Sequence, residues 1–486
     1  MSTDPTLPDA FEDLSPDSVG VSVPGQATCP VCGGFGQPAV VAPSVSEGEA
    51  HPQRLRRPWV HGESWDAEPA EIIDELRRVL SSLERDLVGF RPLLIQSLYA
   101  LLTRENLLIF SPAGTAKTFY AASVFSRIRG ARVFDTQMSK GTLAEELFGS
   151  IDTGQLKRGR IVHNTRGTLV DADLAFIDEF FDANDMVLRA LLGVFNERVF
   201  KKGSQLEHCP LHTGIAAANY LRATEVTEAV LDRFLFRAYI TPDYSPLTLL
   251  GIDQAFARHY GRREVPDPDE QIPLQHIVFL ADIVRGLIPD RRIEAPASVL
   301  FLKNMLLNRY RELIGQACEA AKKRTLYISP RTYAKARIVL NAAALLRGRD
   351  HVTSDDLSQL RYAVTTVGGW EEQAECFDKA LNETLIRIRP ADQDHIDQLV
   401  AARDLAEHVM ARVKDGEAIP CTSFLQRVLR FFGLVSAGDV TFDHVRRFVD
   451  GVKPQDEQVK TLKLEVLRWI QDLARRVDRM DHEPLA

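Results

Sequence analysis

The sequence has little cysteine, no long apolar run and no excess of basic charge, and each absence excludes a class of protein. Six cysteines in 486 residues are too few for a disulfide framework, which favours a reducing compartment. No apolar stretch approaches the roughly 18–20 residues of a membrane span. The net charge is −8, so no bulk attraction draws the chain to nucleic acid or anionic membranes. The acidic N-terminus lacks a secretory signal, so the cytosol is the expected compartment.

The first 65 residues are rich in Pro, Ser, Gly, Asp and Glu and have no helical or strand period, which predicts a disordered segment. Their one feature is the pair Cys29 and Cys32, which is half of a zinc-binding knuckle. A zinc site needs four ligands, and no second pair with this spacing exists. His51 and His61 lie at spacings that fit no zinc-finger pattern. Two reduced thiols are therefore favoured over a zinc site.

Residues 106–120 read NLLIFSPAGTAKTFY, and the rest of the chain is organised around them. A short buried strand runs into a loop of small residues, then into Lys117, Thr118 and a helix. Backbone N–H groups of such a loop wrap the β- and γ-phosphates of a nucleotide, and the lysine adds a positive charge. The threonine hydroxyl can bind Mg²⁺. The residues expected to contact nucleotide are Ser111, Pro112, Ala113, Gly114, Thr115, Ala116, Lys117, Thr118 and Phe119.

The loop departs from the strict pattern G-x-x-x-x-G-K-[ST] at two positions. Alanine fits at position 116 if that residue is already helical, and Gly114 remains for a position with positive φ. Ser111 replaces the first glycine and is harder to explain. Taken alone, the loop leaves open a simple strand-to-helix turn with a solvated Lys117.

Further apolar strands are expected at residues 131–136, 174–177, 214–218 and 235–240, alternating with helices. This alternation predicts a doubly wound parallel sheet, in which ligands sit beyond the carboxyl ends of the strands. Lys117, Asp178, Glu179 and Asn219 each fall at or just after such an end, so we expect them to converge.

The acidic pair can serve phosphoryl transfer to water. Asp178 would hold Mg²⁺ together with Thr118, and Glu179 would position or activate the attacking water. Asn219 could orient that water and sense the γ-phosphate. The alternatives are a solvated junction or a helix cap for the two acids, and a turn residue for the asparagine.

Two arginines are candidates for stabilising transition-state charge. Arg233 could be offered to the γ-phosphate of a neighbouring subunit, with Arg237 as the substitute; the alternative is a surface ion pair with Asp232 or Glu228. Arg331 follows a helix start in which Ser329 is the cap and Pro330 fits the first turn. It could reach back to the γ-phosphate, or it could simply be exposed.

Four segments follow from these patterns: 1–65 disordered, 66–241 an α/β nucleotide-binding domain, 242–385 a helical domain and 386–486 a helical extension. Residues 153–170 and 198–212 are expected as exposed loop or hairpin. The basic stretch 157–166 could touch substrate or nucleic acid, but a solvated loop is favoured. Residues 207–212 (EHCPLH) suggest metal ligands, yet their spacing favours a hairpin tip.

Five blocks in order resemble the AAA+ ATPases of the MoxR family, nearest to the RavA-like branch. They read PAGTAKT, GTLAEELFGS, RGTLVDADLAFIDEFFDANDMVLRALLGVFNERVF, AAANYLRATEVTEAVLDRFLFR and ISPRTYAKA. The resemblance covers about residues 75–365. It implies a P-loop NTPase core, an all-α lid and a helical C-terminal region. Alanine at position 116 is usual in that family, whereas Ser111 departs from it.

The resemblance also implies a role for each residue of the site: Lys117 and Thr118 as Walker A, Asp178 and Glu179 as Walker B, Asn219 as sensor 1, Arg233 as arginine finger and Arg331 as sensor 2. Family members form rings, usually hexamers, with nucleotide between subunits. They carry pre-sensor and helix-2 insertions, for which 198–212 and 153–170 are the natural candidates. Many act on a partner protein, often one with a von Willebrand factor A domain.

The sequence therefore predicts a Mg²⁺-dependent ATPase ring that matures or remodels another protein. Three rivals stay open: the motor of a metal-inserting chelatase, a DNA-acting motor, and a nucleotide-gated scaffold with little turnover. The acidic charge balance argues against the DNA-acting motor.

Overall fold

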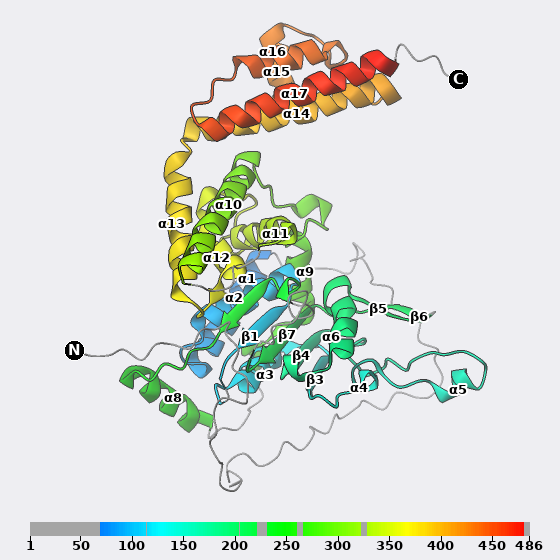
Figure 1. The fold of residues 1–486 in the computed structure, drawn as a ribbon, viewed down its shortest axis with the longest axis vertical. Coiled ribbons are helices and arrows are strands. Elements are labelled where there is room, and N and C mark those ends of the chain that lie inside the picture. Colours follow the sequence, from blue (N-terminus) through cyan, green and yellow to red (C-terminus); the bar gives the residue numbers. More distant parts are fainter. Residues whose placement is uncertain are drawn as a thin grey trace.

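The computed structural model describes residues 69–112, 114–203, 205–220, 231–259, 266–321 and 328–480. The segment 1–65 with its Cys29 and Cys32, and the loop residue Ala113, lie outside the described residues. Figure 1 shows three layers along the long axis: an α/β core, a helical layer above it, and a separate group of helices at the far end. In the described part of the chain, no helix is long and apolar enough to cross a membrane.

The core is built on a six-stranded sheet whose neighbouring strands all run parallel. Its order is β10-β8-β1-β7-β4-β3, and the fold is the predicted doubly wound α/β architecture. The strands, in that order, are Thr366–Val367, Phe236–Tyr239, Leu107–Phe110, Thr213–Ala218, Leu174–Asp178 and Val133–Gln137. Two small sheets flank it: the parallel pair β2 (Ile128–Arg129) with β9 (Ile272–Pro273), and the antiparallel hairpin β5 (Val199–Lys202) with β6 (Gln205–His208).

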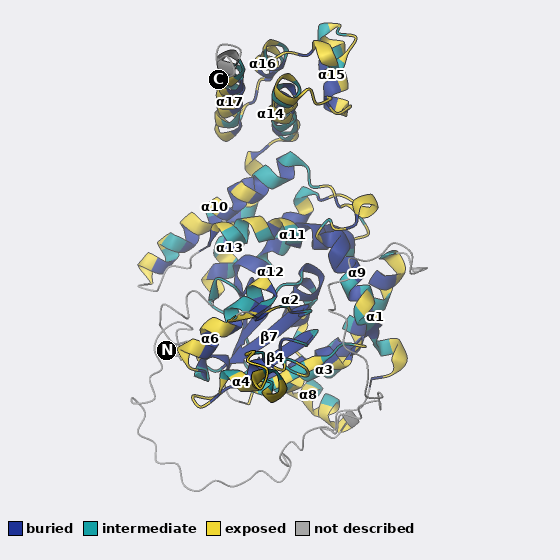
Figure 2. Cartoon of the chain, turned by 90° about the vertical axis from the view of Figure 1, so that its right-hand side faces the viewer, coloured by how far each residue is buried: buried dark blue, intermediate teal, exposed yellow. Residues whose placement is uncertain are grey.

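The sheet separates two hydrophobic cores because successive side chains of a strand point to opposite faces. Leu107 and Ile109 of β1 join one core, and Leu108 and Phe110 join the other. Strand β1 is buried along its whole length, and the central strands are dark throughout in Figure 2. A strand covered on both faces reads as a continuous apolar run, which is why the sequence signals it so clearly.

Helix α6 of the core begins with a side-chain cap. Asn184 accepts a hydrogen bond from the N–H of Val187 and so begins α6, as short polar side chains do at helix starts. The helices of this part are α1 (Pro69–Asp86), α2 (Arg91–Thr103), α3 (Lys117–Ser126), α4 (Ala144–Phe148), α5 (Thr153–Leu156), η2 (Phe180–Asp182), α6 (Asp185–Leu192), η3 (Gly193–Glu197) and α8 (Pro246–His259).

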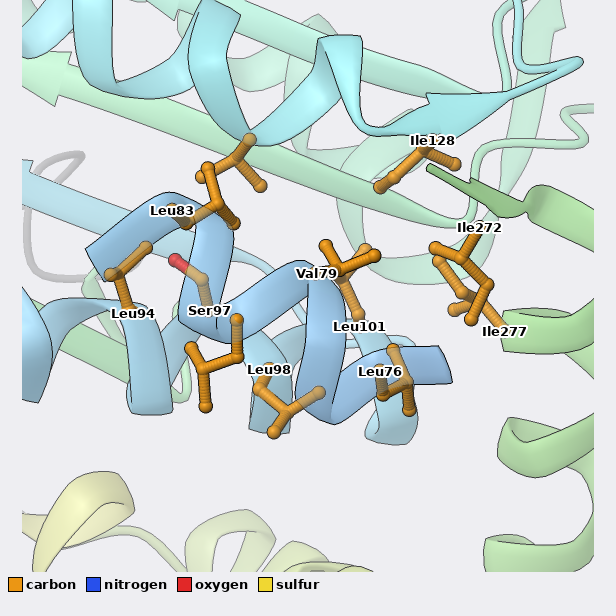
Figure 3. Close-up of a pocket in the computed structure, with 12 residues that line it drawn as sticks. Leu76, Val79, Leu83, Leu94, Ser97, Leu98, Leu101, Ile128, Ile272 and Ile277 are labelled. Carbon is orange, nitrogen blue, oxygen red and sulfur yellow. The ribbon is translucent and has the colours of Figure 1, made fainter. Parts of the chain in front are cut away.

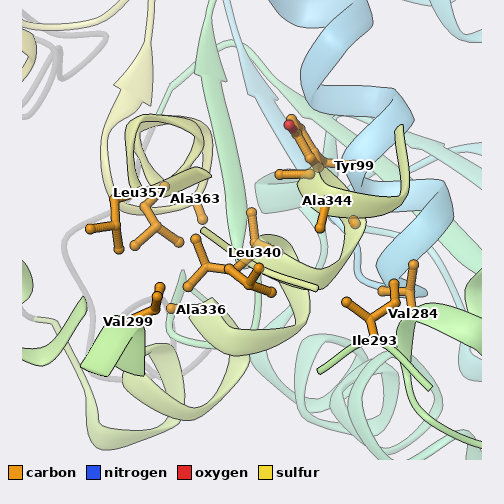
Figure 4. Close-up of a cluster of buried hydrophobic side chains, with 14 of the residues drawn as sticks. Tyr99, Val284, Ile293, Val299, Ala336, Leu340, Ala344, Leu357 and Ala363 are labelled. Carbon is orange, nitrogen blue, oxygen red and sulfur yellow. The ribbon is translucent and has the colours of Figure 1, made fainter. Parts of the chain in front are cut away.

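The helical layer packs on α2 and β8, and its Lys335 pairs with Glu105, just before β1, at 2.6 Å. Figure 4 shows Leu340 and Ala344 of α11 packed together with Tyr99 of α2 and Val284 of α9 in one buried cluster. The helices of this layer are η4 (Pro268–Glu270), α9 (Leu274–Val284), η5 (Pro289–Arg291), α10 (Ala297–Ala320), α11 (Pro330–Leu346), η6 (Ser354–Leu360), α12 (Arg361–Val364) and α13 (Glu371–Arg387). Strand β10, which no pattern in the sequence predicts, returns from this layer to the edge of the core sheet.

The far end of the chain forms a group of packed helices of its own, at the top of Figure 1. Its members are α14 (Pro390–Asp415), α15 (Ser423–Phe432), η7 (Ala437–Asp439), α16 (Phe442–Gly451) and α17 (Glu457–Met480). Helix α14 is followed by Gly416 and α15 by Gly433, both with positive φ, which is a common helix stop. Contacts between α10 and α14 join this group to the layer below.

Candidate active site

The loop between β1 and α3 turns through two residues with positive φ, Gly114 and Ala116. Gly114 has φ +82°, as the sequence predicts for the one glycine of the loop. Ala116 differs from prediction: it is the N-cap of α3 in the left-handed region at φ 61° and is not yet helical. Left-handed backbone is unfavourable for alanine, and such strain gathers at functional sites.

Ser111 fits its position without distortion, although glycine is usual there. It is fully buried and its backbone is outside the positive-φ region. Its N–H donates to the carbonyl of Ala218 at 3.1 Å, and its hydroxyl accepts from Thr115 Oγ1 at 2.5 Å and donates to the carbonyl of Pro112 at 3.2 Å. The serine therefore stabilises the conformation of the loop by hydrogen bonds of its hydroxyl, which a glycine at this position could not form.

The strand ends bring the predicted polar residues together. Lys117 Nζ donates to Asn219 Oδ1, and Asn219 Nδ2 donates in turn to Glu179 Oε1. Thr118 Oγ1 donates to Asp178 Oδ2 at 3.0 Å. The five side chains come from β1–α3, the end of β4 and the end of β7, which are adjacent in the sheet. They form one polar cluster at the carboxyl edge, where α/β folds bind ligands.

The local backbone aims the acidic pair in two directions. Asp178 is the last residue of β4, and its Oδ1 accepts from the N–H of Glu179 at 2.9 Å. Glu179 itself has φ 50°, a strained conformation for a residue with a side chain. This turn lets Asp178 face Thr118 while Glu179 faces Asn219.

The two carboxylates differ electrostatically. Partial burial, and then the nearby charge of Asp178, raise the pKa of Glu179 above its usual range, while Lys117 opposes the shift. A raised pKa suits a carboxylate that must exchange protons with water.

The donor set at Thr118 and Asp178 fits Mg²⁺. Hydroxyl and carboxylate oxygens are the hard ligands that Mg²⁺ prefers, and it takes its remaining ligands from water and substrate phosphates. The hydrogen bond between the two side chains already holds these oxygens 3.0 Å apart.

Arg233 and Arg331 lie near the amino ends of the strands, which we call the amino edge of the sheet. Asp232 and Arg233 come shortly before β8, and Phe236 of β8 is in register with Leu107, the first residue of β1. Arg331 Nη1 forms an ion pair with Asp232 Oδ2 at 2.8 Å. In this structure Arg331 is therefore paired with a residue that precedes β8, and not with the cluster around Lys117, and its contact with a γ-phosphate stays a prediction.

Arg237 is a poor substitute for Arg233. It is half-buried within β8, and burial lowers the pKa of its guanidinium. Its Nε has no hydrogen-bond partner among the described residues. Because the Nε of Arg237 is buried within the fold, Arg233 remains the better candidate for reaching another subunit.

Sequence reasoning missed the part played by Asp232. The sequence indicates it only as an ion-pair partner of Arg233, whereas the structure pairs it with Arg331 on α11, 99 residues further along the chain. No short-range pattern reveals such a contact.

The sequence predicts a hairpin tip at residues 207–212, and this prediction is wrong. Glu207 lies on β6, and Cys209 and His212 follow that strand. Glu207 accepts from Thr165 and Gln205, and His212 is bonded to a backbone carbonyl. Glu207 and His212 therefore have structural partners, and Cys209 is buried.

A separate apolar cavity of about 40 Å³ lies between α1, α2, α3 and the β2–β9 pair (Figure 3). It has room for little more than one water molecule, so it holds no nucleotide. Its one polar lining residue, Ser97, is bonded to Tyr120 at 2.7 Å.

The fold and this cluster define a class of protein: the nucleotide-binding core and helical lid of an AAA+ ATPase. Residues 302–375 match the family model of an AAA lid domain. Residues 74–246 match the model described as the MoxR domain of the MoxR-vWA-beta-propeller ternary systems. The core and lid of the chain thus belong to the MoxR family of AAA+ ATPases. The RavA-like branch stays a prediction.

Several other proteins are similar to part of this chain. Two uncharacterized proteins of Methanocaldococcus jannaschii are 27% and 28% identical, over 60% and 63% of this chain and 70% and 73% of their own length. A structural protein of Acidianus two-tailed virus is 33% identical over 34% of this chain and 27% of its own. A solved structure of a candidate ATPase from Cytophaga hutchinsonii shares the fold, with TM-score 0.50, 18% identity, and coverage of 66% of this chain and 96% of that one.

Proposed function

We propose that this chain is a Mg²⁺-dependent ATPase that assembles into a ring and uses hydrolysis to change the conformation or assembly of a partner protein. The observation that supports it most is the cluster of Lys117, Thr118, Asp178, Glu179 and Asn219 at one sheet edge. Membership of the MoxR family supports the ATPase activity, since hydrolysis is the chemistry of that class.

Each side chain has a distinct task in the proposed reaction. Lys117 binds the β- and γ-phosphates, and Thr118 with Asp178 holds the Mg²⁺ that enters with ATP. When bound, that ion neutralises the charge that develops on the transferred phosphoryl group. Glu179 orients a water molecule for in-line attack and accepts its proton, which its raised pKa favours. Asn219 holds Glu179 in place and reports on the γ-phosphate.

Arg233 and Arg331 act together on the nucleotide of a neighbouring subunit. Arg233 precedes β8, and Asp232, its neighbour in the chain, is paired with Arg331. Two guanidinium groups presented side by side would neutralise charge on the γ-phosphate in the transition state. The active site would then be complete only between two copies, which supports the proposed assembly into a ring.

The partner is proposed to be a protein, and a von Willebrand factor A domain is the first candidate, since the matched family model is named after systems that contain one. Helix α11 connects Arg331 to the helical layer, so the nucleotide state of one subunit would move the layer of the next. That movement is the step that acts on the partner.

Mixing experiments test the shared site. An Arg233→Ala variant and an Asp178→Asn variant should each hydrolyse ATP at a small fraction of the wild-type rate. An equal mixture should recover part of the activity, because some interfaces combine an intact Walker B pair with an intact arginine. Arg311→Ala, an exposed arginine of α10, is the control and should hydrolyse normally. A mixture as inactive as its components would contradict action between subunits.

A further inference from the structure

Almost all of the net charge of the chain lies in its first 53 residues. They hold seven Asp and Glu and no Lys or Arg, whereas the whole chain has a net charge of −8, so the other 433 residues come to −1. Five of the seven carboxylates lie within residues 4–17, which also contain Leu7, Phe11 and Leu14. This segment combines acidic and apolar side chains over a short length.

The core carries a surface of the opposite charge, which we call the basic edge. Six cations of the loop 151–166 and of the tip of the β5–β6 hairpin form it, and all are exposed. None has an ion-pair partner in the part of the chain that the structure describes. They are Lys157, Arg158, Arg160, Arg166, Lys201 and Lys202. Unpaired cations gathered on a nearly neutral body attract an acidic ligand.

The loop and the hairpin are fastened together at the base of this edge. Gln205 accepts from the N–H of His163 at 2.7 Å and donates to its carbonyl at 3.1 Å. Thr165 donates to Glu207 at 2.8 Å. Gly149 has φ +88°, and a Cβ there would lie 1.8 Å from the carbonyl oxygen of Asn164, so only glycine permits this close approach. Figure 1 shows both elements projecting from the same side of the core.

Apolar side chains stand among the cations of the basic edge. Leu156 is 49% exposed, Ile161 62% and Leu206 61%. Exposed apolar groups within a charged rim mark a surface that binds a polypeptide, while nucleic acid would gain little from them. The surface therefore fits an acidic segment that also carries aliphatic or aromatic side chains.

We propose that residues 4–17 of this chain bind the basic edge. Their carboxylates would pair with the six cations, and Phe11 and Leu14 would contact Ile161 and Leu206. The 51 residues from position 18 to position 68 can span up to about 170 Å, while a compact chain of this size has a radius of gyration of about 23 Å. Attachment to the same chain raises the effective concentration of the segment, so even a weak site is occupied.

The segment would then compete with any acidic partner for the same surface. A partner that binds the basic edge must displace residues 4–17, and the displacement would make access to this face of the core selective. This interaction does not involve nucleotide, so it can be tested separately from the ATPase activity.

Carbodiimide coupling of the full-length chain gives the direct test, because this reagent joins a carboxylate to a lysine amine only when the two are in contact. Mass spectrometry should find residues 4–17 joined to Lys157, Lys201 or Lys202. Raising the salt concentration from about 50 mM to about 500 mM should reduce these products about tenfold, since ions screen exposed charges. Coupling of the segment only to lysines elsewhere, or no coupling at all, would overturn the proposal.

Charge reversal at the basic edge sharpens the result. Arg158→Glu with Arg160→Glu leaves all three lysines in place and should reduce the coupled products about tenfold. The matched control, Arg78→Glu with Arg430→Glu, reverses two exposed arginines on α1 and α15 and should leave the products unchanged. Equal coupling in both double variants would contradict a specific site. If the wild-type chain instead shows no coupling and binds single-stranded DNA through Arg158 and Arg160, the edge is a nucleic-acid surface and the proposal fails.

Discussion

The two edges of one parallel sheet carry polar networks of opposite kinds. At the carboxyl edge, Lys117, Asn219 and Glu179 bond side chain to side chain. At the amino edge, Arg198 is buried and bonds mainly to backbone carbonyls. Backbone partners cannot be exchanged, whereas side-chain partners can be replaced by a ligand. The comparison separates a network that holds the fold from one that is free to bind.

The amino-edge network is dense. Arg198 donates to the carbonyls of Arg104 at 3.0 Å and His212 at 3.1 Å, and to Asn106 Oδ1 at 3.1 Å. The Asn106 Nδ2 donates to the carbonyl of Phe195 at 2.8 Å. These bonds tie the base of the β5–β6 hairpin to the starts of β1 and β7. Burial lowers the pKa of the Arg198 guanidinium to about 10, which keeps it charged at neutral pH.

The largest expected effect is at the carboxyl edge. Asp178→Asn should lower the steady-state rate of ATP hydrolysis by at least about a hundredfold, because a neutral amide is a poor Mg²⁺ ligand. The urea midpoint of unfolding should stay close to that of the wild type. A variant with a normal rate would exclude Asp178 as the metal ligand, and a strongly lowered midpoint would show that this edge also holds the fold.

The amino edge should respond in the opposite way. Arg198→Met leaves several buried carbonyls without a donor and should lower the free energy of unfolding by about 3–5 kcal/mol. Hydrolysis per folded molecule should change little at low temperature. Arg189→Met, at an exposed position of α6, is the control for the substitution itself and should unfold like the wild type. Loss of hydrolysis without loss of stability in Arg198→Met would break the comparison.

A smaller effect follows from His212, which is buried at the same edge. Its Nε2–H donates to the carbonyl of Leu101 at 2.7 Å, and burial lowers its pKa to about 3. Below a pH of about 6.5, His212 binds a proton in the unfolded chain but stays neutral in the folded chain. The free energy of unfolding therefore falls as the pH decreases from about 6.5 to about 3.

At pH near 4.5 this histidine should reduce the free energy of unfolding by roughly 2–3 kcal/mol relative to neutral pH. Urea unfolding of the wild type and of His212→Gln at both pH values measures it. The variant should lose less stability on acidification, and equal losses would contradict a buried neutral imidazole.

The sequence was enough to predict the carboxyl edge because each residue there follows its own strand. Apolar runs locate the ends of β1, β4 and β7, and parallel topology brings those ends together. The left-handed backbone at Ala116 and Glu179 was not predictable, because surrounding contacts impose it against local preference. Ser111 likewise fits through bonds to Ala218 and Thr115 that no local pattern contains.

The amino edge and the helical layer could not be predicted in the same way. Periodicity indicates that residues 242–385 are mainly helical, but it does not say which edge of the sheet they cover. The packing of these helices on the sheet brings Arg331 to Asp232 and not to Lys117. The burial of Arg198 could not be predicted either, since arginine side chains are usually exposed and only tertiary contacts bury this one.

At the carboxyl ends of the strands, different residues are expected to serve nucleotide binding and hydrolysis. Equilibrium binding of fluorescent ATP, measured together with ATP turnover, tests this most directly. Glu179→Gln keeps Lys117 and the metal ligands, so it should bind ATP about as tightly as the wild type while its turnover falls at least about a hundredfold. Lys117→Ala should lose binding. If Glu179→Gln hydrolyses ATP at the wild-type rate, or if Lys117→Ala binds ATP normally, the account of this site is wrong.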